Sequence, residues 1–114
     1  MEHKMHLFAG PFNLVKSGKK TIEIRIYDAK RRKVKVGDTI IFEELSPSGR
    51  TVKCRVVGLS IFKSFRDLFI AFDKSKFGHP KSITLAEQLG RMHSIYTKKE
   101  EAKDGVLGIH IKLA

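Results

Sequence analysis

Two predicted strands joined by a short turn constrain the fold of this chain more than any other feature. Residues 39–44 are predicted as one strand and residues 50–62 as a longer one, with a bulge or bend at Gly58. Between them, residues 46–49 have the turn-forming composition Ser-Pro-Ser-Gly. The hairpin makes these strands antiparallel neighbours, which disfavours a doubly wound α/β fold, because that fold joins parallel strands through crossover helices.

The remaining elements are short and mixed in type. Further strands are expected at residues 4–8, 21–27 and 106–113, and helices at residues 11–17 and after the capping residues Ser64, Thr84 and Thr97. Pro11 is expected at the first helical position. Because the last strand lies far from the first along the chain, the set predicts an α+β fold, a curved sheet or small mixed barrel with flanking helices.

Length and composition predict one cytoplasmic domain, and the charge balance suggests an anionic partner. The 114 residues fit a single domain over residues 1–114. Lys and Arg total 23 against 12 Asp and Glu, a net charge of +11, which suggests nucleic acid but also fits a lysine-rich soluble surface. Cys54 is the one cysteine and is expected in the core. No membrane span or signal peptide is recognisable.

No metal or cofactor is predicted. The five histidines show no metal-ligand spacing with cysteine or with each other. Phosphate-loop and dinucleotide-binding fingerprints are missing from the sequence.

The strand predicted at residues 21–27 carries the most informative side chains. Its alternation places Ile22, Ile24 and Ile26 on one face and Thr21, Glu23, Arg25 and Tyr27 on the other. Lys20 precedes the strand, after a turn that Gly18 permits. The polar face is either an ordinary solvated surface or the lining of a cleft. In a cleft, Arg25 would offer a planar fork to phosphate or a base edge.

The same residues resemble a known signature. Gly18, Lys20, Glu23 and Arg25 reproduce the pattern G-x-K-x-x-E-x-R of the ASCH family, a branch of the PUA-like β-barrels. Three further segments resemble that family in the same order: residues 36–42, residues 64–68, and Tyr96 followed by residues 105–109. The resemblance covers nearly the whole chain, and it implies a PUA-like barrel of about five to six strands whose signature residues line a cleft.

The resemblance also implies two kinds of function. ASCH domains are generally thought to bind RNA, some cleave it, and one related branch is an amidohydrolase that removes acetyl from N4-acetylcytidine. In that branch a Thr with a catalytic part lies three residues after the signature Lys. Glu23 occupies that position here, and a carboxylate cannot replace the hydroxyl nucleophile.

The leading hypothesis is therefore a monomer that binds RNA or a modified nucleoside in a basic cleft. The candidate binding residues are Lys19, Lys20, Glu23, Arg25, Tyr27, Arg31, Arg32 and Tyr96. Arg25 would grip phosphate or a base edge, Glu23 would order its neighbours, and Tyr96 would stack on a base.

Two alternatives remain open. A hydrolase acting on an acylated nucleoside or on RNA would use Lys20 to polarise the scissile group and Glu23 as the general base. A partner-binding domain would instead take an acidic protein segment in the same cleft.

Overall fold

The computed structural model describes residues 1–114 and is built on one five-stranded mixed sheet. The strands are β1 (Glu2–Leu7), β2 (Ile22–Ile26), β3 (Thr39–Glu44), β4 (Thr51–Phe62) and β5 (Val106–Leu113). Their order across the sheet is β1-β3-β4-β5-β2. The β1–β3 pair is parallel and the other pairs are antiparallel, so the predicted β3–β4 hairpin is confirmed.

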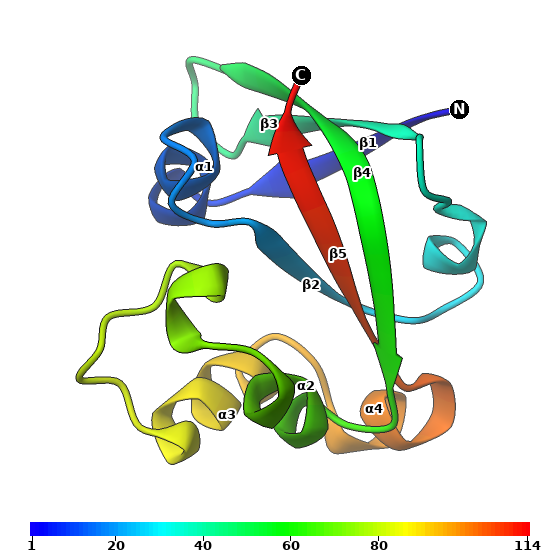
Figure 1. Ribbon diagram of the computed structural model, residues 1–114, viewed down its shortest axis with the longest axis vertical. Helices are drawn as coiled ribbons and strands as arrows, with labels where there is room; N and C mark the ends of the chain where they lie inside the picture. The colour runs from blue at the N-terminus through cyan, green and yellow to red at the C-terminus, as the bar shows by residue number, and fades with distance from the viewer.

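The sheet curls into a half-barrel whose edges are β1 and β2 (Figure 1). The α+β class and the barrel-like architecture are thus confirmed, with five strands and an open side. In the long strand β4, the register with β5 shifts between Val56 and Gly58. This irregularity is the predicted bend, and such a bulge increases the local twist that a strongly curved sheet needs.

Four α-helices and two short 3₁₀ helices accompany the sheet. They are α1 (Ala9–Lys16), η1 (Arg31–Lys33), α2 (Phe65–Ala71), η2 (Lys74–Phe77), α3 (Leu85–His93) and α4 (Lys98–Asp104). Ser64, Thr84 and Thr97 cap α2, α3 and α4 as expected, each accepting a hydrogen bond from the backbone three residues on. None of these helices has the length and apolar content needed to cross a bilayer.

The position of Pro11 differs from the expectation. Helix α1 begins at Ala9, so Pro11 is the third helical residue and not the first. Proline at the third helical position removes no hydrogen bond. The backbone N–H groups of a first helical turn have no partner within the helix, so the N–H that proline lacks is not needed there.

Two hydrophobic layers meet along the sheet. Helix α1 packs Phe12 and Val15 against the concave face, where the core includes Ile40, Phe42 and Ile109. A second layer forms on the outer face, where the isoleucines of β2 pack with α2 and η2 through Phe65, Leu68, Phe69 and Phe77. Figure 1 shows the resulting arrangement, with α1 on one side of β2 and α2, α3 and α4 together on the other.

Asp38 fixes the edge strand β1 against β3. Its carboxylate accepts hydrogen bonds from the Lys35 backbone (2.9 Å), the His3 side chain (2.8 Å) and the N-terminal amine (3.3 Å). These hydrogen bonds, of which the one from His3 has the largest effect, lower the pKa of Asp38 to about 2. The tether matters for the site, because the far end of β1 forms one wall of the cleft described below.

Two glycine substitutions should move stability in opposite directions. Gly105 ends α4 at φ 74°, and a Cβ there would lie 2.9 Å from the carbonyl oxygen of Phe62. Gly105→Ala should lower the free energy of unfolding by more than about 1 kcal/mol. Gly90 is inside α3, and a Cβ added there would meet open space. Gly90→Ala should therefore raise the free energy of unfolding by up to about 1 kcal/mol. Urea unfolding followed by circular dichroism measures both, and equal effects would contradict the structure.

Candidate functional site

The pairing of β2 with β5 decides where the signature side chains lie. Glu23 is opposite Ile109 and Arg25 is opposite Leu107. Residues directly opposite in an antiparallel pair share one face of the sheet. Since Leu107 and Ile109 belong to the concave core, Glu23 and Arg25 are on the concave face as well. The isoleucines between them point to the helices on the outer face.

Lys20, Glu23 and Arg25 form one ionic network. The Lys20 ammonium lies 2.8 Å from Oε1 of Glu23, while Nε and Nη2 of Arg25 lie 2.8 Å and 2.6 Å from Oε2. Nη2 of Arg25 also donates to the backbone carbonyl of His6 in β1, at 2.9 Å. Arg25 therefore bridges the two edge strands of the half-barrel, between which there is no backbone ladder.

The turn before β2 brings Lys20 to the carboxylate. Gly18 has φ 78°, a left-handed conformation that favours glycine. The backbone N–H groups of Lys19 and Lys20 both donate to the carbonyl of Leu14, and the next N–H, of Thr21, donates to the carbonyl of Lys76. The chain thus leaves α1 through a tight turn, and Lys20 reaches Glu23 three residues further on.

Glu23 stays ionised inside the protein. Its side chain is only 3% exposed. Burial alone would raise its pKa, but the charges of Lys20 and Arg25, together with hydrogen bonds from both, outweigh burial and hold the pKa of this carboxyl below its ordinary range. Both carboxylate oxygens are already in use, so Glu23 orients cations and has little capacity for anything else.

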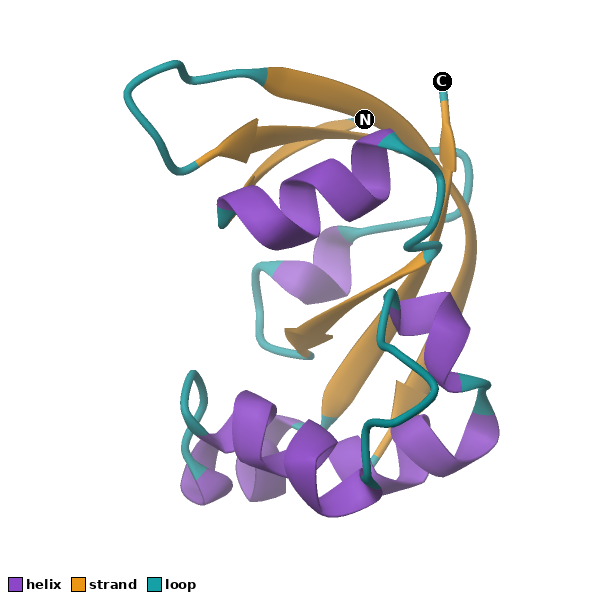
Figure 2. Cartoon of the chain, turned by 90° about the vertical axis from the view of Figure 1, so that its left-hand side faces the viewer, coloured by secondary structure: helices purple, strands orange, loops and turns teal.

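A cleft of about 250 Å³ opens over this network. Its floor is β2, and its walls come from the β1–α1 junction on one side and from η2 and α3 with the turn after it on the other. Figure 2 shows β2 running between α1 and the group of helices at the opposite end of the molecule. The polar and aromatic residues that line it are His6, Phe8, Lys20, Glu23, Arg25, Phe77, His79, Arg91 and Tyr96.

His79 is a neutral hydrogen-bond donor in this cleft. Burial, followed by the nearby cations Arg91 and Lys20, lowers its pKa to about 4. Its Nδ1 pairs with the Nε2 amide of the buried Gln88 at 3.0 Å. Because that amide nitrogen can only donate, Nδ1 accepts and the ring hydrogen is on Nε2.

The fold of this chain has counterparts among known proteins. The family model of the ASCH domain matches residues 5–114. The chain belongs to the ASCH family. No curated protein matches it.

Three solved structures place this ASCH domain among its structural relatives. It is similar to hypothetical protein PH0355 at 32% identity and a TM-score of 0.88, over 100% of both chains. Protein PF0455 from Pyrococcus furiosus is 33% identical with a TM-score of 0.75, covering 99% of this chain and 97% of that one. An ASCH protein from Zymomonas mobilis is 10% identical with a TM-score of 0.65, covering 97% and 66% respectively, a likeness of fold alone.

The ASCH domain brings only part of the predicted residue set to the cleft. Lys20, Glu23, Arg25 and Tyr96 line it, whereas Lys19 is exposed outside it. Tyr96 is partly buried and stacks on Phe65, with ring centroids 5.8 Å apart. The proximity of these four residues follows from the structure, while their roles in binding stay a prediction.

Tyr27, Arg31 and Arg32 lie elsewhere. The Arg32 guanidinium covers the Tyr27 ring at 4.2 Å, and both line a separate, shallow groove. Arg31 forms an ion pair with Asp28 at 3.2 Å. Tyr27 still packs against the concave core, but it lies beyond the end of β2 that is farther from Lys20. Arg31 and Arg32 follow where the chain turns away into η1.

Several cleft residues carry no recognisable signal in the sequence. Phe8, His79, Arg91 and Ile95 line the cleft although none belongs to a motif. They come from three segments that are distant in the chain and meet only because the outer helical layer packs on β2. The burial of Gln88, which fixes His79, is equally invisible to pattern analysis.

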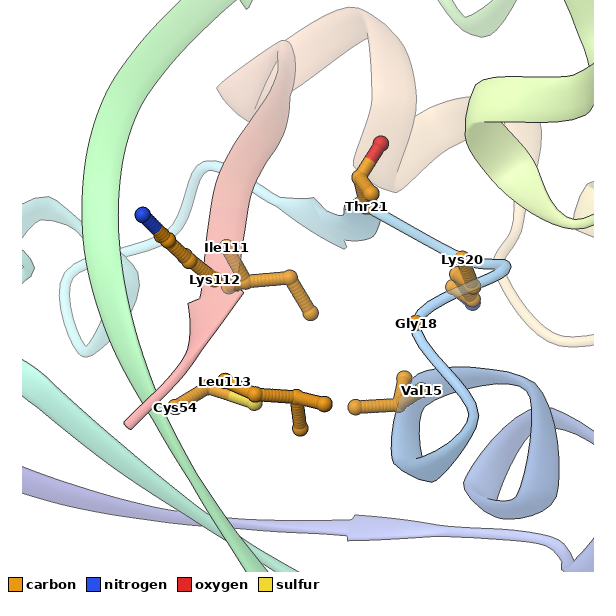
Figure 3. Close-up of a pocket in the computed structure, with 8 residues that line it drawn as sticks. All are labelled: Val15, Gly18, Lys20, Thr21, Cys54, Ile111, Lys112 and Leu113. Carbon is orange, nitrogen blue, oxygen red and sulfur yellow. The ribbon is translucent and has the colours of Figure 1, made fainter.

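A second pocket, of about 290 Å³, lies at the other end of α1 and is largely apolar. Figure 3 shows Val15 of α1 and Leu113 of β5 pointing toward one another across it, with the Cys54 thiol nearby. Burial raises the pKa of Cys54 to about 11, so this thiol is protonated and unreactive at neutral pH. No three His, Cys, Asp or Glu side chains gather as metal ligands anywhere in the chain.

Removing the buried carboxylate should destabilise the fold in a pH-dependent way. Glu23→Gln leaves Lys20 and Arg25 without their counter-charge and should cost about 3–5 kcal/mol of unfolding free energy at pH 7. Because the folded pKa of Glu23 is lowered, its contribution is complete above the ordinary value of 4.5 and is lost as the pH falls through the folded value. The difference between the variant and the wild type should therefore shrink below about pH 4.

Urea titrations of both proteins from pH 2 to pH 7 measure this difference. Glu43→Gln is the matched control, because Glu43 pairs with Lys4 and His6 at the surface, at 3.6 Å and 3.7 Å. Glu43→Gln should lower the free energy of unfolding far less than Glu23→Gln does. A pH-independent loss for Glu23→Gln would show that its charge is not what matters.

Proposed function

We propose that this ASCH domain binds single-stranded RNA, with one nucleoside of the strand in the cleft over β2. The observation that carries the proposal is a surplus of hydrogen-bond donors in that cleft, because Lys20, Arg25, His79 and Arg91 bring more N–H groups than the protein has acceptors for there. The one carboxylate there, Glu23, already has both oxygens occupied.

The free donors can be traced atom by atom. Nε and Nη2 of Arg25 bond Glu23 and His6, which leaves the two N–H groups of Nη1 without a protein partner. Lys20 uses its ammonium for one contact and retains further N–H groups. His79 offers Nε2–H, and Arg91 forms no ion pair. A ligand that satisfies this set is anionic and rich in acceptors, as nucleobase carbonyls and phosphates are.

The size and lining of the cleft narrow the ligand further. Its volume of about 250 Å³ is slightly below the roughly 300–1,000 Å³ of pockets for drug-sized ligands, so it suits one nucleoside. Apolar side chains such as Met92 and Ile95 provide contact area for a planar base. The net charge of +11 attracts a polyanion over longer distances, which favours a strand over a free nucleoside.

Glu23 argues for binding over hydrolysis. A general base at neutral pH needs a raised pKa and a free oxygen near the attacking water. The pKa of Glu23 is lowered, and Lys20 and Arg25 hold both of its oxygens. The same features make it an effective anchor for the two cations.

Titration with short RNA at several salt concentrations tests the binding proposal. Binding should weaken with salt, by about 0.7 log unit per log unit of salt for each phosphate contact. Arg91→Ala should weaken binding and lower that slope by up to about 0.7, without loss of stability, because Arg91 is exposed and unpaired. Arg66→Ala removes an exposed arginine of α2 outside the cleft and should change binding much less.

The outcome also separates RNA from an acidic protein segment. Undetectable binding of RNA at low salt would refute the proposal. Acidic peptides that bind in the cleft and are not displaced by RNA would point to a protein partner.

Incubation with substrates tests the hydrolytic alternative. We expect 5′-labelled RNA and N4-acetylcytidine to be recovered intact after prolonged incubation with excess protein, as measured by gel electrophoresis and by acetate release. Turnover that disappears in Glu23→Gln, with the variant shown to be folded, would make Glu23 a catalytic residue and contradict the binding-only assignment.

A further inference from the structure

Three large apolar side chains are exposed around the mouth of the cleft. Phe8 is 65% exposed, Leu45 is 52% exposed and Ile95 is 59% exposed. All three line the same cleft, although they come from the β1–α1 junction, the β3–β4 turn and the segment after α3. Isolated exposed apolar residues are ordinary, but their convergence at the rim of one cleft marks a contact surface.

The fold gains nothing visible from phenylalanine at position 8. Phe8 is the N-cap residue of α1, where Ser, Thr, Asp or Asn would accept a hydrogen bond from the first turn. Phe8 makes no such bond, and its ring is mostly in solvent instead of the core. A side chain that neither caps the helix nor packs inside is a candidate for contact with a ligand.

The backbone beneath this rim is fixed. The N–H of Leu45 donates to the carbonyl of Leu7 at 2.8 Å, which ties the β3–β4 turn to the end of β1. Arg50 reinforces the turn, with Nε 3.0 Å from Oε1 of Glu44 and Nη2 3.1 Å from Oδ1 of Asn13 in α1. The N–H of Ile95 donates to the carbonyl of Met92 at 3.1 Å. The rim is therefore largely preorganised, which lowers the entropic cost of ordering it around a ligand.

We propose that Phe8, supported by Leu45 and Ile95, is a stacking platform for the nucleobase next to the one in the cleft. This inference rests on the proposed function and specifies its ligand as an oligonucleotide of at least two nucleotides. Aromatic rings stack on bases of any sequence. The charge pattern favours nucleic acid over an apolar protein segment as the occupant, because Arg91 lies at the same cleft and can contact the phosphate that links the two nucleosides.

Calorimetric titration of the wild type and of Phe8→Ser tests the platform. The probes are the four nucleoside 5′-monophosphates and the four 5′-phosphorylated homodinucleotides. The wild type should bind at least one dinucleotide more tightly than its monophosphate. Phe8→Ser should weaken dinucleotide binding about 5- to 100-fold and weaken monophosphate binding much less, because Phe8 lies at the mouth of the cleft and not over its floor. Its melting temperature should be equal or higher, because serine is a favourable N-cap.

Two further variants separate stacking from general hydrophobicity. Phe8→Tyr keeps an aromatic ring and should retain dinucleotide affinity. Phe8→Leu should lose most of the difference in affinity between the dinucleotide and the monophosphate. Ile70→Ser removes an apolar side chain of α2 that is 62% exposed and lies outside the cleft, and it should have no effect on either probe.

Each result supports or overturns the inference. Equal affinity of Phe8→Ser and the wild type for dinucleotides would overturn the platform, while RNA binding that still depends on Arg91 would leave the proposed function intact. If the wild type binds neither probe nor longer RNA, both the stacking platform and the proposed RNA-binding function are refuted. Self-association of the wild type in sedimentation, lost in Phe8→Ser while dinucleotide binding is kept, would assign the rim to a contact between copies of the chain and overturn the platform.

Discussion

The buried carboxylate of Glu23 is the constraint around which the rest of this molecule is organised. An isolated charge in the interior costs several kcal/mol, so Glu23 requires cations held close to it. Lys20 comes from the turn after α1, and Arg25 comes from β2 itself. Arg25 also reaches the His6 carbonyl and thereby joins the two edge strands of the half-barrel. The same atoms thus satisfy a buried charge, close the open side of the sheet and form the floor of the cleft.

This shared use of atoms shapes the chemistry that the cleft offers. Because Glu23 keeps a lowered pKa and both of its oxygens are occupied, the cleft presents N–H groups and no free carboxylate. Neutral His79, fixed by Gln88, adds another donor. Such a surface is complementary to acceptor-rich anions, and its rigidity is inherited from the fold. The exposed apolar rim extends it with contact area that the fold itself does not use.

Local patterns in the sequence predicted much of this architecture. The alternation of isoleucines in β2, the turn residues of the hairpin and the three helix caps each depend on neighbours within a few residues, and the structure contains all of them. The signature spacing likewise identified Lys20, Glu23 and Arg25, because residues two apart in a strand share a face wherever that strand is placed. Pro11 was misplaced by two residues, since its restricted φ suits every position in the first turn.

The sequence by itself therefore determined the element types, the face of β2 that carries the charges and the membership of the ASCH family. Only the tertiary structure decided that this face is buried, because burial depends on the β2–β5 register and on the curl of the sheet. It also decided which other residues share the cleft. Phe8, His79 and Arg91 lie far apart in the chain, and Tyr27, adjacent to the signature strand, lies outside the cleft. Contacts between distant segments are set by packing, which local periodicity does not encode.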